Sequence, residues 1–401
     1  MRYCSRCMLP ETHETITFDE QGVCNVCRGH EFKKTKIDWP RKQKELEKII
    51  EQYRGKYSYD CLVPFSGGKD STYTLWELVK NFRLKCLAIS FDHGFMRPTL
   101  TENRTRTFKI LGVDSLIFKS DWHVVTKLML ESLRRKGDFC WHCHTGIFSY
   151  PMQMAIKLNV PLIIWGETQA EYTAYYSYED TLNEKEEVDE RRFNRFVNLG
   201  ITAEDMIGML DDPTIEPRDL EPYTYPKLKD LKAINFRSIC LGGYMPWDVK
   251  KQVEIIKREL GWKEDPNAGI PECYGYEKIE CQQQGIRDYL RVIKRGYGRT
   301  AHLTTLDVRN NRLNRKEAEE LVRKYDGKRP HSLPLFLEML GITEEEFNEI
   351  ARSHIIHPHK WDFSNVDTGP KLHDQDKWDR TQPLAREYTK KRLESARYSK
   401  V

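Results

Sequence analysis

The sequence predicts an α/β protein whose core is a doubly wound parallel sheet. Between residues 59 and 241, short apolar segments alternate with longer segments of helical periodicity. That alternation is typical of strands joined by helices that cover both faces of a parallel sheet. Polar sequences, several of them containing glycine, directly follow the apolar segments. The chain of 401 residues is longer than a single core usually supports, so two or three domains are expected.

The individual elements follow in chain order from these patterns. The five expected strands cover residues 59–65, 85–91, 115–118, 160–165 and 236–241. The expected helices cover residues 38–55, 71–79, 99–111, 121–136, 144–158, 247–260 and 315–324. Residues 178–232 are highly charged and contain prolines, which indicates a helical and irregular insertion that covers the functional edge of the sheet.

Composition limits the class of protein. Apolar residues make up 39% of the chain and charged residues 31%, and no apolar run is long enough to cross a bilayer. The N-terminus lacks the apolar segment of a secretory signal, so a cytoplasmic protein is expected. The net charge of +4 is too small to predict a nucleic-acid partner. Eleven cysteines in such a chain favour metal ligands over disulfides.

Two cysteine pairs lie close to the N-terminus. Cys4-x-x-Cys7 and Cys24-x-x-Cys27 flank a segment, residues 15–18, that can form a strand, and a glycine turn follows it. Two such knuckles on a hairpin make the tetrahedral thiolate cage of a zinc ribbon. Because few aromatic or basic residues surround it, we expect a structural or docking role. The expected domains are a zinc ribbon over 1–35, the sheet domain over 36–245 and a mostly helical region over 246–401.

The sequence Ser66-Gly67-Gly68-Lys69-Asp70-Ser71 follows the first strand and opens a helix. Glycines let a backbone approach phosphate oxygens closely, and the first N–H groups of a helix attract an anion. The hydroxyls and Lys69 add donors and positive charge, while Asp70 is expected to act through Mg²⁺ or to cap the helix. The spacing differs from that of a Walker A loop.

This loop resembles the SGGxDS signature of the PP-loop, or ATP-pyrophosphatase, superfamily. The resemblance implies a Rossmann-like sheet of the adenine nucleotide α-hydrolase-like type. It also implies cleavage of ATP, with Mg²⁺, between the α- and β-phosphates, so that a substrate oxygen becomes adenylated. Lys69 and Asp70 are then catalytic, and the loop from Ser66 to Ser71 binds the nucleotide.

Two further polar sequences follow strands of the predicted sheet. Asp92 ends the second strand, and Glu167 follows the fourth. Ligands of such sheets bind at the carboxyl ends of the strands. We therefore expect Asp92 to contribute to nucleotide binding. Of Glu167 and Glu171, which both follow the fourth strand, we expect Glu167, at the sheet edge, to orient the acceptor or the nucleophile.

A second group of cysteines follows the third strand. Cys140 and Cys143 form a third close pair, and Cys240 lies near the end of the fifth strand. The tRNA thiolases of the PP-loop superfamily carry a comparable trio that ligates a [4Fe–4S] cluster, whose open iron binds a nucleophile. Three interpretations stay open: such a cluster, a zinc site completed by His142 or His144, or no metal.

The motifs "PFSGGKDS", "CWHCH", "IIWGETQAEY" and "LGGYMPWD", behind an N-terminal cysteine ribbon, together resemble the bacterial N-acetyl sugar amidotransferases of the WbpG and PseA type. That family acts in lipopolysaccharide O-antigen and nonulosonic acid synthesis. The resemblance covers roughly residues 2–350. It implies that an N-acetyl group of a sugar nucleotide or nonulosonic acid is adenylated and that ammonia then displaces AMP, which leaves an acetamidino group.

The source of ammonia is expected to be a separate protein. The first cysteine, Cys4, is a predicted zinc ligand rather than an N-terminal nucleophile, and no Gly-x-Cys-x-Gly elbow of a glutaminase occurs. The family resemblance implies glutaminase and cyclase-like partner subunits. For the sugar nucleotide, arginine forks suit phosphate and carboxylate groups. The candidate substrate-binding residues are Arg295, Arg299, Arg309 and Arg312.

Two other functions fit parts of the sequence. A tRNA or metabolite sulfurtransferase of the same fold would use the second cysteine group. A non-catalytic zinc-ribbon interaction protein would retain the loop without consuming ATP, although the intact Ser66, Lys69 and Asp70 argue against it.

Overall fold

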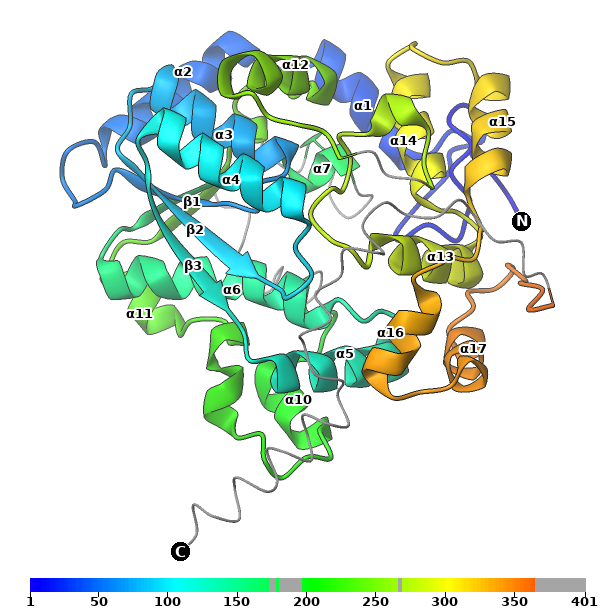
Figure 1. The fold of residues 1–401 in the computed structure, drawn as a ribbon. Coiled ribbons are helices and arrows are strands. Elements are labelled where there is room, and N and C mark those ends of the chain that lie inside the picture. The colour runs from blue at the N-terminus through cyan, green and yellow to red at the C-terminus, as the bar shows by residue number, and fades with distance from the viewer. Residues whose placement is uncertain (173–177, 180–196, 266–268, 365–401) are drawn as a thin grey trace, which may run out of the picture.

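The computed structural model describes residues 1–172, 178–179, 197–265 and 269–364 (Figure 1). Five parallel strands form one sheet in the order β3-β2-β1-β4-β5. The strands are β1 (Cys61–Pro64), β2 (Cys86–Asp92), β3 (Asp114–Lys119), β4 (Leu162–Trp165) and β5 (Arg237–Cys240). The strand order reverses between β1 and β4, as in a doubly wound sheet. The predicted fold class is therefore confirmed.

The strands differ in burial according to their place in the sheet. β1, β2 and β4 lie inside and consist almost entirely of buried residues, as expected for parallel strands covered on both faces. β3 lies at one edge of the sheet, and its Leu116 and Ile117 are exposed. Central strands must bury both faces, so their uninterrupted apolar runs are readily recognised in the sequence.

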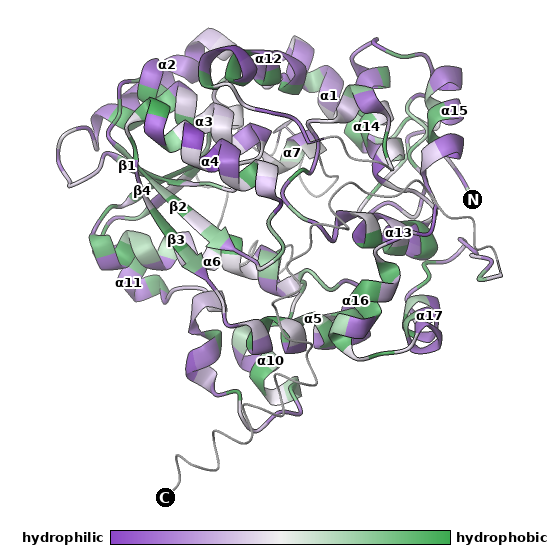
Figure 2. Ribbon diagram, viewed as in Figure 1, coloured by the Kyte–Doolittle hydropathy of each residue, from purple (hydrophilic) through white to green (hydrophobic). Residues whose placement is uncertain are grey.

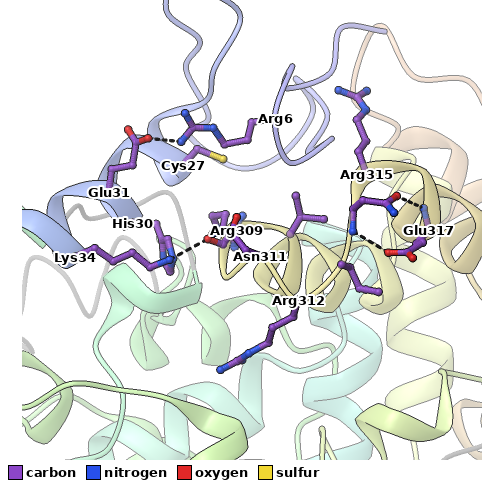
Figure 3. Close-up of a pocket in the computed structure, with 13 residues that line it drawn as sticks. Arg6, Cys27, His30, Glu31, Lys34, Arg309, Asn311, Arg312, Arg315 and Glu317 are labelled. Atoms are coloured by element: carbon purple, nitrogen blue, oxygen red, sulfur yellow. Dashed lines mark hydrogen bonds and ion pairs between the residues drawn. The ribbon is translucent and has the colours of Figure 1, made fainter.

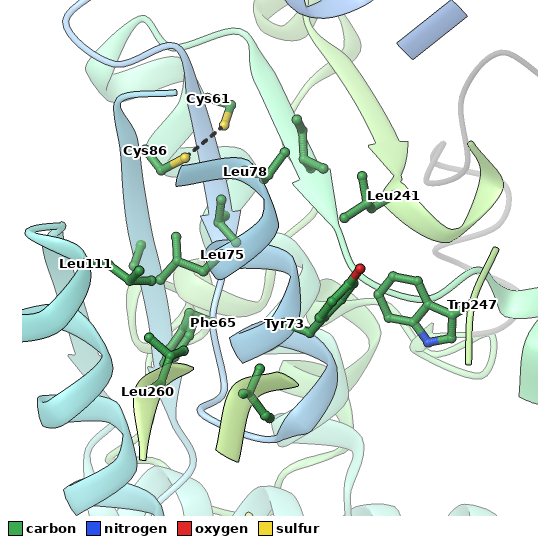
Figure 4. Packing of buried hydrophobic residues seen from close by; sticks show 14 of the residues in the cluster. Cys61, Phe65, Tyr73, Leu75, Leu78, Cys86, Leu111, Leu241, Trp247 and Leu260 are labelled. Atoms are coloured by element: carbon green, nitrogen blue, oxygen red, sulfur yellow. Dashed lines mark hydrogen bonds between the residues drawn. The ribbon is translucent and has the colours of Figure 1, made fainter. Parts of the chain in front are cut away.

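One face of the sheet is covered by three helices that pack on one another (Figure 1). They are α3 (Lys69–Lys80), α4 (Pro98–Leu111) and α12 (Val249–Leu260). Leu75 of α3 and Leu260 of α12 belong with Phe65, which follows β1, to the largest apolar cluster (Figure 4). The ring of Tyr73 meets that of Trp247 edge-on at 5.6 Å between centroids. This ring contact joins α3 to the segment that precedes α12.

The opposite face is covered by α6 (Trp141–Leu158), which contacts β1, β2 and β4 (Figure 1). α5 (Trp122–Lys136) packs on α6, and the Asp121 carboxylate caps it by accepting the N–H groups of His123 and Val124. Within the expected insertion, residues 180–196 lie outside the described residues. The remainder forms α10 (Ala203–Met209), η2 (Pro217–Tyr223) and α11 (Leu228–Ala233), which precede β5.

The N-terminal segment folds as a cysteine-centred module followed by α1 (Asn25–Thr35) and α2 (Trp39–Glu51). Residues 15–18 do not form the strand that their sequence allows. Their backbone makes only a single β-bridge, from Phe18 to Cys24. The cysteine cage makes a longer ladder unnecessary. The turn that follows is held by the Asp19 carboxylate, which accepts the N–H groups of Gln21 and Val23.

The C-terminal region is mostly helical, as predicted, and its last described helix ends at Ser353. Its helices are α13 (Gln284–Arg295), α14 (Arg299–Arg309), α15 (Arg315–Tyr325), α16 (Leu333–Leu340) and α17 (Glu344–Ser353). Hydropathy follows this packing, with apolar strands inside and polar outer faces on helices such as α15 (Figure 2). In the parts of the chain that the structure describes, no helix has the length and apolarity needed to span a membrane. Residues 365–401 lie outside the described part.

Candidate functional site

The loop after β1, Ser66–Ser71, lies where the strand order reverses, between β1 and β4. We call it the glycine turn. In doubly wound sheets, the crevice at this edge is where ligands bind. α3 begins within the turn, and its first residue, Lys69, follows Gly68, which offers no side-chain cap. The N–H groups of the first helical turn are therefore available for an anion.

The glycine turn is held in shape by its two serines. The Ser71 hydroxyl accepts hydrogen bonds from the N–H groups of Ser66 and Gly67 at 3.3 and 3.2 Å. The Ser66 hydroxyl accepts the N–H of Gly68 at 3.2 Å. Gly67 has φ +90°, a conformation that favours glycine, and its carbonyl accepts the indole N–H of Trp262 at 3.1 Å. These hydrogen bonds within the loop fix the backbone of the turn.

Lys69 is buried beside the turn and pairs with two carboxylates. Its Nζ atom lies 2.7 Å from Asp70 Oδ2 and 2.8 Å from Glu277 Oε2, and only 4% of its side chain is exposed. Burial opposes the charge of Lys69, but the carboxylates of Asp70, Glu277 and Glu280 hold its pKa well above the usual range. Lys69 therefore keeps its positive charge at the start of α3.

Two carboxylates that were not predicted from the sequence face Lys69 from the C-terminal region. Glu277 and Glu280 lie between η4 (Glu272–Tyr274) and α13, more than 200 positions after the turn in the chain. A Cβ atom on Gly68 would lie 1.9 Å from Glu280 Oε1, so Glu280 directly covers the glycine turn. The only signal is the dense polar sequence Tyr-Gly-Tyr-Glu-Lys-Ile-Glu-Cys, which has neither strand nor helix periodicity.

Glu167 occupies the edge of the sheet next to the glycine turn. It follows β4, and the preceding Gly166 approaches Asp70 and Thr74 so closely that a Cβ atom would lie 3.0 Å from the Thr74 hydroxyl. Burial, helped by the negative charge of Asp70, raises the pKa of Glu167 to about 7, although Lys69 opposes the shift. A carboxyl group with such a pKa exchanges protons near neutral pH.

Asp92 ends β2, on the far side of β1 from β4. Its carboxylate accepts the N–H of Gly94 at 2.9 Å and thereby shapes the loop after the strand. The structure thus places Ser66–Ser71, Asp92 and Glu167 along one edge of the sheet.

The four N-terminal cysteines form a compact cage. All four are buried, and their sulfur atoms lie within 4.8 Å of one another. The Sγ atoms of Cys4 and Cys27 are 4.0 Å apart, and those of Cys7 and Cys24 are 3.6 Å apart. Tetrahedral Zn–S bonds of about 2.3 Å require S···S distances of about 3.8 Å. The cage therefore fits a zinc ion, and backbone N–H groups at 3.3–3.5 Å from the Cys4 and Cys24 sulfurs suit thiolates.

The second cysteine group is not assembled as the trio of Cys140, Cys143 and Cys240. Cys140 packs in an apolar cluster with Phe95, whereas Cys240 lies in another cluster, on the α6 face of the sheet. The cysteine that joins the pair is Cys281: it packs against the cluster of Cys140 and, after burial, is the largest cause that raises the pKa of Cys143. Among the described residues, only the N-terminal cage brings three or more ligand atoms within 4.8 Å.

The four arginines expected to bind substrate fall into two pairs. Arg295 pairs with Glu14 at 3.0 Å, and Arg299 pairs with Asp288 at 2.9 Å, so both are engaged in internal contacts. Arg309 and Arg312 instead line a cavity between α1 and the α14–α15 connection (Figure 3).

Comparison with known proteins relates the C-terminal region to a family. An uncharacterized protein of the archaeon Methanocaldococcus jannaschii is 28% identical over 167 residues, which is 41% of this chain and 58% of the relative. The chain thus spans little more than half the length of that curated relative. Residues 272–373 match the family described as "LPS biosynthesis protein WbpG-like, C-terminal domain". This match relates the chain to the WbpG-like LPS biosynthesis proteins, the family that the sequence motifs indicate.

Proposed function

We propose that this protein is an ATP-dependent amidotransferase that converts an N-acetyl group of a sugar nucleotide, or of a nonulosonic acid, into an acetamidino group. The proposal rests on one observation: two parts of the chain that are far apart in sequence contribute residues to the same site. The glycine turn of the sheet domain holds Lys69, and the WbpG-like domain supplies the carboxylate of Glu277 that pairs with it. A relative of lipopolysaccharide biosynthesis proteins with such a turn suits a reaction that uses a nucleotide and acts on a sugar.

The first step is adenylation of the acetamide. The acetamide oxygen attacks the α-phosphorus of ATP, the bond to the β-phosphate breaks, and pyrophosphate leaves toward the glycine turn. Lys69 and the first N–H groups of α3 stabilise the negative charge of that leaving group. Asp70 is the carboxylate of the turn that would hold Mg²⁺, which neutralises part of the triphosphate charge when bound.

The second step replaces oxygen by nitrogen. Ammonia attacks the carbon of the O-adenylyl intermediate, and the C–O bond breaks to release AMP. The product keeps the sugar nitrogen and gains a second nitrogen, so it is an amidine. The attacking ammonia must lose one proton as the amidinium product forms, and Glu167, with a pKa of about 7, is the group proposed to accept it.

Ammonia comes from a separate glutaminase in this proposal. The cysteine that could serve an N-terminal glutaminase, Cys4, belongs to the metal cage. A second, cyclase-like subunit would convey ammonia to the site, and the cysteine module offers a docking surface. The cytoplasm is the compartment in which such nucleotide-activated sugars and ATP meet.

Mass spectrometry tests the proposal directly. The zinc-loaded protein is incubated with ATP, Mg²⁺, an ammonium salt and a panel of UDP-linked diacetamido sugars. We expect one acetamido sugar to lose about one dalton, since NH replaces O, while AMP and pyrophosphate form in equal amounts. Glutamine in place of ammonium should give no product without the partner. Formation of ADP, or an unchanged mass for every acetamido sugar, would refute the proposal.

A further inference from the structure

A cavity lies between the cysteine module and the C-terminal helices (Figure 3). Its volume is about 740 Å³, within the range of small-molecule sites. Its walls come from the turn between Cys4 and Cys7, from α1, and from the connection between α14 and α15 with the adjoining helix ends. Residues that are far apart in the chain therefore meet here only in the folded protein.

The lining is strongly cationic. Five of the lining residues carry a positive charge and two carry a negative charge. The positive residues are Arg6, Lys34, Arg309, Arg312 and Arg315, and the negative residues are Glu31 and Glu317. A concave site with an excess of positive charge focuses its field on an anion.

Three of these cations have carboxylate partners, whereas Arg309 has none among the described residues. Arg6 pairs with Glu31 at 2.5 Å, Arg312 with Asp248 at 2.8 Å, and Arg315 with Glu319 at 2.7 Å. Arg309 is only 7% exposed, and its Nη1 atom has no hydrogen-bond partner within the described structure. A buried guanidinium donor without a partner is costly, and a bound anion relieves that cost.

His30 adds a neutral polar group to the same cavity. Burial, together with the charges of Arg309 and Lys34, lowers the pKa of His30 to about 3. Its Nε2 atom is buried and has no hydrogen-bond partner in the part of the chain that the structure describes. The cavity therefore combines an unpaired cation with a neutral imidazole, a pattern that suits the diphosphate and a neighbouring hydroxyl of a nucleotide.

We propose that the cavity lined by Arg309, His30 and Lys34 binds the nucleoside diphosphate part of the substrate. The inference deepens the proposed function and rests on it for the identity of the ligand. α14 connects the two sites: its first residue, Arg299, donates to the carbonyl of Glu277, the partner of Lys69, while Arg309 is its last residue. A helix of this length spans about 15 Å, so the cavity and the glycine turn are separate sites.

A rival role for Arg309 is to balance the charge of the metal-bound thiolates. Its positive charge lowers the pKa of Cys7, after stronger effects of Cys24 and Cys27, and Cys27 itself lines the cavity. The two roles make different demands. Charge balance requires Arg309 for zinc retention, whereas nucleotide binding requires it for affinity while zinc stays bound.

Calorimetric titration of the full-length, zinc-loaded protein with UDP, without ATP, tests the site. We expect UDP to bind and Arg309→Gln to weaken the binding about tenfold or more, because a charge-assisted hydrogen bond is lost. Arg323→Gln is the matched control, since Arg323 is exposed on α15 and lies outside the lining. Zinc content and thermal unfolding, measured for each variant, establish that it is folded and metal-loaded.

Lys69→Met separates this inference from the proposed function. It should abolish pyrophosphate release while UDP binding stays unchanged. ADP and inorganic pyrophosphate, titrated in parallel, distinguish the sources of a diphosphate, and we expect UDP to bind best. Equal UDP affinity of the wild type and Arg309→Gln would overturn the inference. The inference would also be overturned if Lys69→Met lost UDP binding, or if ADP bound more tightly than UDP. The same holds if Arg309→Gln lost both UDP binding and zinc.

Discussion

The Nζ atom of Lys69 lies 2.8 Å from Oε2 of Glu277, and this contact joins the glycine turn to the C-terminal region, whose residues 272–373 match the WbpG-like family model. Both side chains are almost completely buried, so the pair is shielded from solvent. The consequence is that the C-terminal domain completes the site rather than being attached beside it. Changes on either side of the contact should therefore affect both stability and nucleotide use.

A double-mutant cycle measures this contact. Lys69→Met leaves Asp70 and Glu277 without their common cation, and we expect the free energy of unfolding to fall by about 3 kcal/mol. Glu277→Gln leaves Lys69 paired with Asp70 and should cost about 1–2 kcal/mol. The double variant should be less destabilised than the sum, by more than about 0.5 kcal/mol. Lys80→Met, at the exposed end of α3, is the control and should change little. Strict additivity in urea unfolding would contradict the contact.

Glu167 makes the stability depend on pH. Its pKa is raised from 4.5 in the unfolded chain to about 7 in the folded protein, so folding is opposed when the carboxyl group ionises. Glu167→Gln should leave the free energy of unfolding unchanged below about pH 4.5. The substitution should increase the free energy of unfolding progressively as pH rises from about 4.5 to 7, and by a constant amount of about 3 kcal/mol above about pH 7. Chemical denaturation at several pH values tests this.

The same residue predicts the pH profile of pyrophosphate release. As a proton acceptor, Glu167 works only when ionised, so the rate should rise with pH through about 7. In Glu167→Gln the rise of the rate with pH should disappear, and the remaining rate should be at least about 100-fold lower. Glu171→Gln is the matched control on the neighbouring helix α7 (Gln169–Tyr172). If Glu167→Gln still showed the rise of the rate with pH, the titrating group would be another residue.

The two glycines of the turn differ in a testable way. Gly67 has φ +90°, and a methyl group there would lie 3.1 Å from Leu100 Cδ1, so Gly67→Ala should destabilise the protein by about 1–3 kcal/mol. Gly68 has φ −69°, and the flexible end of Glu280 is the nearest obstacle to a methyl group there. Gly68→Ala should therefore fold almost normally yet bind ATP weakly, because the added methyl blocks the phosphates. Thermal unfolding and ATP titration of both variants decide the matter.

Zinc is expected in the N-terminal cage at one ion per chain, measured by elemental analysis. Cys4→Ser should lose it, whereas Cys240→Ser, in the core beside the sheet, should keep it. Loss of zinc should loosen residues 1–35, because the cage shapes the segment around Cys4 and Ser5. Arg315 donates to the carbonyls of these two residues at 3.0 and 2.8 Å, and these contacts should be lost with the cage. Limited proteolysis should then cut first within that segment. An intact, protease-resistant N-terminus after zinc removal would show that the cage holds without metal.

The sequence by itself determined the elements whose signal is local. The apolar runs of β1, β2 and β4 and the spacing of the four N-terminal cysteines each reflect a constraint satisfied within a few residues. The glycine turn at Ser66–Ser71 is likewise recognisable because it needs special residues in a fixed order. These local constraints are sufficient to predict the sheet, the turn at its edge and the cysteine cage.

Only the tertiary structure decided which distant residues meet. Glu277 and Glu280 reach the glycine turn, Cys281 rather than Cys240 lies with Cys140, and Arg309 faces the cavity while Arg295 and Arg299 form internal ion pairs. Nothing in a local pattern encodes such encounters, because they depend on how packed helices and loops return to the same edge of the sheet. The physical reason is that burial and charge pairing select partners by distance in space, which the order of residues along the chain does not reveal.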